Sequence, residues 1–183
     1  MAKKTEKPIE KIEFPSQYTV LSADLSLRQP GFCLLHIKKN INGLAVITEV
    51  KLMSVRNKTK QNKTHGELLD DIISAFIEFC PDVPNLYFVR ETEVLHMKVP
   101  SERNVSKVVG MMDWAAWCME KEWYSVYPVT VKKLVTGSGK AEKSEVAAAL
   151  EKYIGKQEYR CDDESDAAAV AIAWLIQQGQ IKE

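Results

Sequence analysis

The chain has 183 residues, of which 45% are hydrophobic and 27% charged, and its 25 basic residues balance its 25 acidic ones. This size and composition predict one soluble globular domain and exclude a disordered chain. No apolar run reaches the roughly 18 residues that a membrane span requires, and the N-terminus lacks a hydrophobic stretch resembling a signal peptide. We therefore expect a cytoplasmic protein with no membrane partner, and the zero net charge excludes a globally basic surface.

The four cysteines favour reduced thiols over disulfides. They are far apart, form no CxxC pair and lie in or beside apolar segments, at Cys33, Cys80, Cys118 and Cys161. Reduced thiols buried in the core are the expected state in a cytoplasmic domain.

The first part of the chain predicts an arm followed by antiparallel strands. Residues 1–17, rich in Lys, Glu and Pro, show no amphipathic period and are expected to form a flexible arm ahead of a single domain over residues 18–183. An Asn-Gly pair between apolar runs predicts a hairpin. The apolar runs that predict the three strands are residues 19–24, 31–39 and 44–52.

A basic loop and a well-marked helix come next. Residues 56–63 contain several basic residues and no acidic one, so a polar loop is expected. Thr64 and Glu67 have the spacing of a capping box, and apolar residues follow at the 3.6-residue period of a helix. A helix is therefore expected to begin at Thr64.

The remaining elements alternate between strands and helices. The helix expected at residues 104–121 has a broad apolar stripe widened by Trp114 and Trp117, which fits either core packing or a partner surface. Alternation after an antiparallel start predicts a mixed sheet with helices on both faces. The other expected elements are strands at residues 86–91 and 123–130, a short helical turn with a glycine-marked loop, and helices at residues 142–153 and 163–178.

Four carboxylates stand at positions that can converge. Asp24 and Glu91 end apolar strands, and Asp163 and Asp166 are three residues apart at a helix start, so the last two share a helix face. Carboxylates gathered in one place raise each other's pKa unless a cation lies among them, and their hard oxygens suit Mg²⁺ or Mn²⁺. Two such ions would suit phosphodiester hydrolysis.

Each of these acids also has a plain structural interpretation. Acids in the first turn of a helix complement its dipole, which alone explains the run DDESD, and an acid at a strand end is usually a solvated loop residue. The structural interpretation does not account for Asp24 closing an apolar strand, or for Arg90-Glu91 directly after LYFV.

The stretch GSGK is similar to a phosphate-binding loop but fails its pattern. Leu134 stands where the P-loop needs its first glycine, Ala141 stands where it needs Ser or Thr, and Glu142 breaks GxGxxG. Binding of a nucleotide triphosphate is therefore not expected. A lysine cluster remains, which fits either phosphate contact or a solvated surface; its members are Lys132, Lys133, Lys140 and Lys143.

Two motifs resemble a known family. VKKLVTGSGKAEKSEV followed by DDESDAAAVAIA resembles the C-terminal half of RuvC-type Holliday junction resolvases, in residue types and in spacing. ADLSLRQPGF and YFVRE resemble the family's first strand and the strand of its catalytic glutamate, so the resemblance covers about residues 18 to 178.

The resemblance implies an RNase H-like fold with a five-stranded mixed sheet, three antiparallel strands being followed by parallel ones. It implies a homodimer that cuts opposed strands of four-way DNA with two divalent ions, Mg²⁺ or Mn²⁺, per site. It assigns metal binding to Asp24, Glu91, Asp163 and Asp166. It assigns a catalytic and DNA-binding role to Lys132 and Lys143, and the helix at residues 104–121 to the dimer. We also assign DNA contacts to Lys133, Lys140, Arg28, Arg103 and Lys107.

The chain departs from the family pattern at two places. Leu25-Ser26 replaces Pro-Gly after the first aspartate, and Val94 stands where known members carry an aromatic that helps part the junction. Strict junction specificity is therefore in question, and a phage or prophage origin would fit such drift. The alternatives are a relaxed nuclease acting on forks, flaps or hybrids, and a junction-binding protein without cleavage.

Overall fold

The computed structural model describes residues 11–56, 63–92 and 100–182, with the side chains of residues 100–103 left out. Within these residues a five-stranded sheet has the order β3-β2-β1-β4-β5. β1, β2 and β3 are antiparallel neighbours, whereas β4 and β5 run parallel to β1. The predicted mixed sheet is therefore confirmed. The strands are β1 Gln17–Asp24, β2 Gly31–Lys39, β3 Ala45–Ser54, β4 Leu86–Glu91 and β5 Trp123–Val126.

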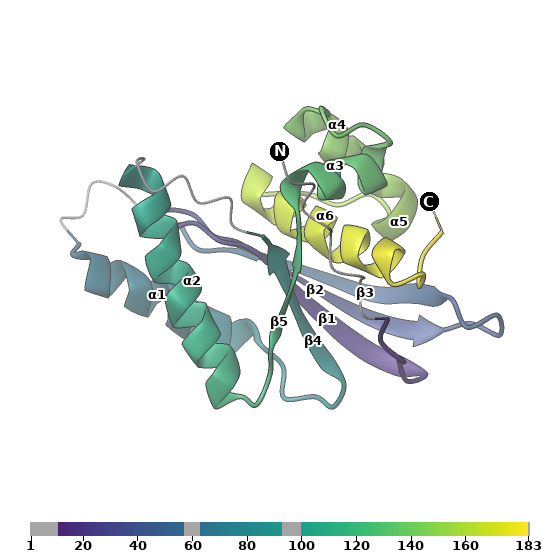
Figure 1. Ribbon diagram of the computed structural model, residues 1–183, viewed down its shortest axis with the longest axis horizontal. Coiled ribbons are helices and arrows are strands. Elements are labelled where there is room, and N and C mark those ends of the chain that lie inside the picture. The colour runs from purple at the N-terminus through teal and green to yellow at the C-terminus, as the bar shows by residue number, and fades with distance from the viewer. Residues whose placement is uncertain (1–10, 57–62, 93–99, 183) are drawn as a thin grey trace, which may run out of the picture.

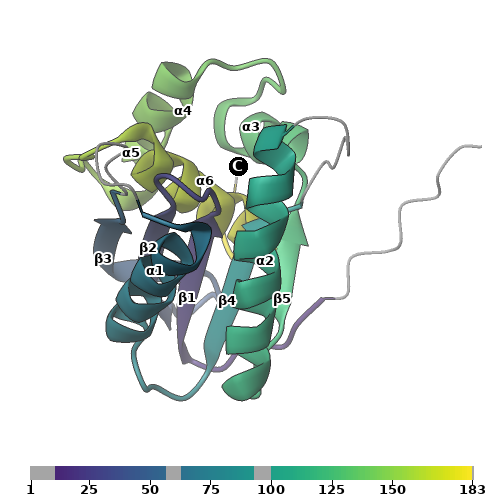
Figure 2. The ribbon, with the colours of Figure 1, turned by 90° about the vertical axis from the view of Figure 1, so that its left-hand side faces the viewer.

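Helices cover both faces of the sheet (Figure 1), as the sequence predicts. α1 and α2 lie on one face, which Figure 2 turns toward the viewer, and the later helices lie on the other. Strand side chains alternate between the two: Leu21 packs with the α1 and α2 cluster, and Val20 packs with the α6 cluster. The helices are α1 His65–Phe79, α2 Pro100–Cys118, α3 Pro128–Thr136, α4 Lys143–Ala149, α5 Glu151–Ile154 and α6 Asp162–Gln177.

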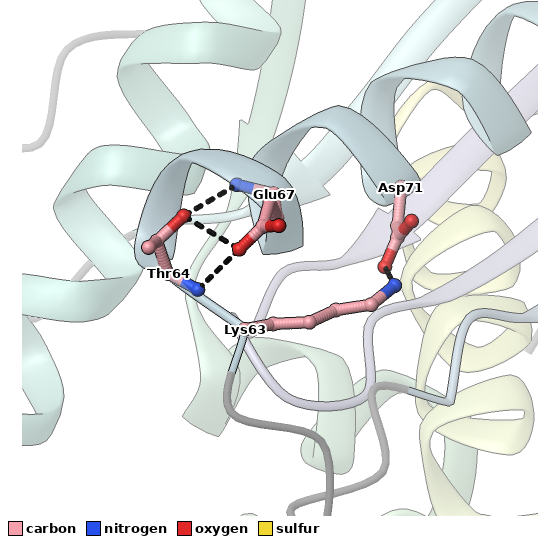
Figure 3. Close-up of polar contacts among 4 residues, drawn as sticks. All are labelled: Lys63, Thr64, Glu67 and Asp71. Atoms are coloured by element: carbon pink, nitrogen blue, oxygen red, sulfur yellow. Dashed lines mark hydrogen bonds and ion pairs between the residues drawn. The ribbon is translucent and has the colours of Figure 1, made fainter.

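The capping box at the start of α1 forms as predicted (Figure 3). Thr64 Oγ1 accepts the backbone N–H of Glu67 at 3.3 Å, and Glu67 Oε2 accepts the backbone N–H of Thr64 at 2.7 Å. These bonds satisfy backbone donors that the first helical turn leaves free. Lys63, at the end of the basic loop, forms an ion pair with Asp71, which lies one helical turn after Glu67 (Figure 3).

α6 lies against the middle of the sheet with almost every side chain from Ala167 to Ile176 buried. The run of alanines lets the helix approach the strands closely. Ser22 of β1 donates a hydrogen bond of 2.6 Å from its Oγ to the carbonyl of Ala167. This contact fixes the helix along the strand that carries Asp24.

Two expected elements differ from the structure. β5 ends at Val126, not at residue 130, because Pro128 lacks a backbone N–H for the ladder and its fixed φ starts α3. The expected helical turn is therefore a nine-residue helix. The helix expected at residues 142–153 is divided at Leu150 into two short helices, α4 and α5.

The expected arm is too long. Residues 1–10 lie outside the described residues, but Phe14 is only 5% exposed. Its ring lies 4.6 Å from that of Tyr18 and 5.4 Å from that of Trp174, measured between centroids. Lys39 Nζ donates to its carbonyl at 2.6 Å. Phe14, which composition assigns to a flexible arm, is therefore packed against aromatic side chains of β1 and of the C-terminal part of α6.

All four cysteines are free thiols, as predicted, although Cys118 is exposed and only Cys33 is fully buried. Among the described helices, none is long and apolar enough to cross a bilayer.

Candidate active site

Asp24 and Glu91 end neighbouring parallel strands on the same edge of the sheet. The pairing of β1 with β4 runs to Ala23 opposite Arg90, so the next residue of each strand is one of the two acids. Alternation turns both toward the face of α6, since Val20 and Val89 point that way. The sequence-based expectation that strand ends gather carboxylates is met for this pair.

The N-terminus of α6 reaches the same edge through a close contact with β2. Gly31 pairs with Asp24, and a Cβ added to Gly31 would lie 2.0 Å from the carbonyl oxygen of Asp163. No side chain fits in that space, so Gly31 lets the helix start rest directly on the strand. Asp163 and Asp166 are thereby held beside Asp24.

The electrostatics show that the four carboxylates share one region. Burial, followed by the charges of Glu91, Asp166 and Asp163, raises the pKa of Asp24 to about 7. Burial and the charge of Asp166 raise the pKa of Glu91 to about 7 as well. Burial also raises the pKa of Asp163, against the opposing influence of Lys143 and of a hydrogen bond with Cys161. Without a cation, this site therefore holds protons more tightly than ordinary carboxyls do.

Lys143 brings a positive charge to this acidic edge. Its Nζ donates to Asp166 Oδ2 at 2.5 Å. Burial alone would lower the pKa of Lys143, but the hydrogen bond and the charges of Asp166, Asp24 and Asp163 raise it. Lys132 of α3 is also close enough to lower the pKa of Glu91. The structure therefore brings both predicted lysines to the carboxylates.

The donor chemistry of this edge fits a hard divalent cation. Four carboxylates gathered at one edge gain from a cation that neutralises their charge, and oxygen donors select Mg²⁺ or Mn²⁺ over softer metals. The part of the chain that the structure describes nevertheless contains no cluster of three or more acidic, His or Cys side chains already drawn together as metal ligands. Lys143 instead occupies one oxygen of Asp166.

The two remaining acids of the run behave differently from each other. Asp162 is exposed in the first turn of α6, as expected of an acid that complements the helix dipole. Glu164 also lies in the first turn, as expected, but it is 1% exposed and in addition accepts hydrogen bonds from Ser54 Oγ at 2.8 Å and from the N–H of Arg160 at 2.9 Å. It joins β3 and the preceding loop to α6, and no local pattern signals this role.

The other predicted DNA contacts are dispersed. Lys133 and Lys140 are exposed on α3 and in the glycine loop, and Arg28 is exposed in the turn after Asp24. Lys107 lies on α2 with its Nζ 2.6 Å from His65 Nδ1, so it contacts α1 and not the acidic edge. The side chain of Arg103, like Val94, lies outside the described residues.

The sheet order and the acidic edge together define an RNase H-like protein. The solved structure of Thermus thermophilus RuvC in complex with a Holliday junction substrate has this fold, with a TM-score of 0.70, 20% sequence identity, and coverage of 89% of this chain and 97% of that one. The free Thermus thermophilus RuvC structure gives a TM-score of 0.67 at 20% identity, over 85% of this chain and 92% of that one.

The chain belongs to the RuvC family of crossover junction endodeoxyribonucleases. The model of this family, described as "Crossover junction endodeoxyribonuclease RuvC", matches residues 20–174. The curated RuvC of Sulfurovum sp. is 27% identical over 159 residues, which cover 85% of this chain and 94% of that protein. The RuvC of Porphyromonas gingivalis is 24% identical over 166 residues, covering 89% and 84%. The resemblance seen in the sequence is therefore confirmed.

Proposed function

We propose that this protein is a metal-dependent Holliday junction resolvase that acts in DNA recombination and repair in the cytoplasm. It hydrolyses two opposed strands of a four-way junction and leaves 5′-phosphate and 3′-hydroxyl ends. The observation that carries the proposal is the meeting of Asp24, Glu91, Asp163 and Asp166 at one sheet edge, with Lys143 and Lys132 beside them. Family membership and the structural likeness to a junction-bound RuvC support the substrate.

The four carboxylates are the groups that would hold two divalent ions, Mg²⁺ or Mn²⁺. When bound, such ions activate a water and stabilise the leaving oxygen of a phosphodiester. The chain itself supplies a rigid mount, because Asp24 and Glu91 lie in a sheet and the two later aspartates on a buried helix. Ligands on rigid elements lose little entropy when the substrate arrives.

The lysines balance the charge of the approaching phosphate. Lys143 and Lys132 lie at the carboxylates, where an ammonium stabilises negative charge that develops on the phosphate. Three exposed basic residues contribute contacts with the DNA phosphates: Lys133, Lys140 and Arg28. Such contacts make the affinity for DNA depend on the salt concentration. We assign further contacts with the DNA backbone to Arg103 and Lys107 of α2.

A homodimer would present two such sites to the two opposed strands. The surface that fits this role lies on α2, where Trp114 is 62% exposed and Trp117 is 74% exposed. Exposed tryptophans are costly to leave in water and are common at the centres of interfaces. The predicted stripe thus divides into a buried part, which includes Met112, and an exposed part.

The test is cleavage of end-labelled substrates by the purified full-length protein. A mobile four-way junction, a fork, a flap, a duplex and an RNA–DNA hybrid are each incubated with Mg²⁺, Mn²⁺ or EDTA. Paired symmetric nicks confined to the junction, ligatable afterwards and absent with EDTA, are the expected result. Equal cutting of forks would replace the proposal by a relaxed nuclease. A gel shift with the junction but no cleavage in either metal would leave a binding protein.

A further inference from the structure

Arg90 is a largely buried cation that lies outside the acidic site. It precedes Glu91 in β4, and its side chain points to the opposite face of the sheet, toward α2. Only 15% of the side chain is exposed. Burying a guanidinium is unfavourable unless it is paired with an anion or another partner, so the contacts of Arg90 must offset this cost.

Three contacts join this cation to α2 and β5. Arg90 Nη1 lies 2.8 Å from Asp113 Oδ1 of α2, an ion pair whose angles fall short of a hydrogen bond. The guanidinium carbon lies 5.6 Å from the ring centroid of Trp123 on β5, within range of a cation–π interaction. Trp123 Nε1 in turn donates to the carbonyl of Met112 at 3.0 Å. These contacts form a closed triangle between β4, β5 and α2.

The triangle lies at the end of β4 where pairing with β1 stops. Pairing with β1 stops at Ala23 opposite Arg90, so Glu91 has a ladder partner only on the β5 side, at Val126. Glu91 also lies beside Asp24, and the two carboxylates repel each other when both are ionised. A strand end under such repulsion needs an anchor on its other face.

We propose that Arg90 is a positioning residue for Glu91: its ion pair with Asp113 and its stacking on Trp123 fix the end of β4 against α2 and hold the Glu91 carboxylate in reach of a divalent cation. The inference rests on the proposed function, since it presumes that Glu91 is a metal ligand. It also joins the metal site to the helix that carries the exposed Trp114.

The test is Mn²⁺ binding to the metal-free full-length protein, followed by the electron paramagnetic resonance signal of free Mn²⁺. Arg90→Met and Asp113→Asn should each weaken Mn²⁺ binding by about threefold to tenfold, less than the loss of a direct partner of a metal ligand, because Arg90 points to the opposite face of the sheet from Glu91. The double variant should lose no more than the worse single variant, because both act through one contact. Arg90→Lys should lose part of the affinity, since a lysine lacks the planar fork.

Lys51→Met is the matched control, because it removes a half-exposed ion pair with Glu49, 3.3 Å long, on the edge strand, and it should leave Mn²⁺ affinity unchanged. Asp113 is 52% exposed, so Asp113→Asn is expected to fold even if Arg90→Met does not. Lower unfolding temperatures with unaltered Mn²⁺ affinity would overturn the positioning role and leave a purely structural pair. If Glu91→Gln binds Mn²⁺ as the wild type does, the metal-site assignment fails and the positioning role fails with it.

Discussion

Asp24 lowers the stability of the metal-free protein when its carboxyl is ionised. It closes a strand of buried side chains, where burial and three neighbouring carboxylates raise its pKa to about 7. An acid in this position destabilises the metal-free protein whenever it is ionised. Such a residue is explained by what it binds and not by what it stabilises.

Replacing Asp24 by asparagine should therefore stabilise the metal-free protein at high pH. Below the unfolded-state pKa of 3.8 the acid is protonated in both states and contributes nothing. As the pH rises from 3.8 to about 7, the unfolded chain releases its proton while the folded chain retains it, so the native state loses stability, and above pH 7 this loss is complete. Asp24→Asn should raise the free energy of unfolding at pH 8 by on the order of 2–4 kcal/mol, and by little at pH 4.

Denaturant unfolding in EDTA at both pH values measures this difference. The same variant should lose junction cleavage while it still shifts a labelled junction in a gel. Equal unfolding free energies for variant and wild type at pH 8, or full cleavage by the variant, would contradict the assignment of Asp24.

The two exposed lysines differ in what surrounds them. Lys143 is hydrogen-bonded to Asp166 at the carboxylates, whereas Lys133 is exposed on α3. Lys143→Ala should lower the cleavage rate at saturating junction by at least about tenfold, since it removes charge stabilisation at the reacting phosphate. Lys133→Ala should instead weaken junction binding and reduce the salt dependence of affinity by about one phosphate contact. Single-turnover rates and binding titrations across salt concentrations separate the two; identical profiles would show that neither lysine has a specific role.

The position of helix α6 depends on a backbone contact at Gly31, which has no side chain. Its first residues rest on Gly31 of β2, and this contact places Asp163 beside Asp24. The helix is otherwise held by buried small residues, which tolerate little displacement. Any group added at the contact must move the helix start.

Gly31→Ala tests this dependence. Its Cβ would lie 2.0 Å from the carbonyl oxygen and 2.3 Å from the carbonyl carbon of Asp163, both backbone atoms. We expect a loss of about 1–3 kcal/mol in the free energy of unfolding and severe loss of cleavage. Gly66→Ala on α1 is the matched control, because its Cβ would meet only Thr64 Oγ1 at 3.8 Å, an ordinary contact, and Ala is favoured over Gly within a helix by about 0.5–1 kcal/mol. Chemical denaturation and junction cleavage report both effects, and wild-type behaviour of Gly31→Ala would refute the contact.

Local patterns predicted most elements of this fold because their causes are local. The Thr64 and Glu67 capping box and the strand ends at Asp24 and Glu91 follow from spacing alone. The differences come from contacts distant in sequence: Phe14 packs against the ring of Trp174, and the buried Glu164 accepts a hydrogen bond from Ser54. For the same reason the four carboxylates were predictable as candidates, whereas the hydrogen bond between Lys143 and Asp166 was not.

α2 lies on the face of the sheet opposite the acidic site and carries an exposed surface of its own (Figure 2). Its buried side chains, such as Val108 and Met112, pack on the sheet, and its exposed side carries Trp114 and Trp117. A four-way junction has two opposed strands to cut, so one site per chain would suffice only if two chains act together. The exposed side of α2 is the surface on which we expect the second copy.

The final prediction concerns this pairing. Trp114→Glu with Trp117→Glu would place charge in an apolar interface, so the variant should be monomeric by analytical ultracentrifugation at concentrations where the wild type is a dimer. Each monomer keeps its carboxylates, so nicks in single strands should persist at a reduced rate while paired symmetric nicks disappear. Ile77→Glu, at a side chain that is 55% exposed on α1, is the control and should remain dimeric. A double tryptophan variant that stays dimeric and still makes paired nicks would place the partner on another surface, because two charged residues cannot be buried there without cost.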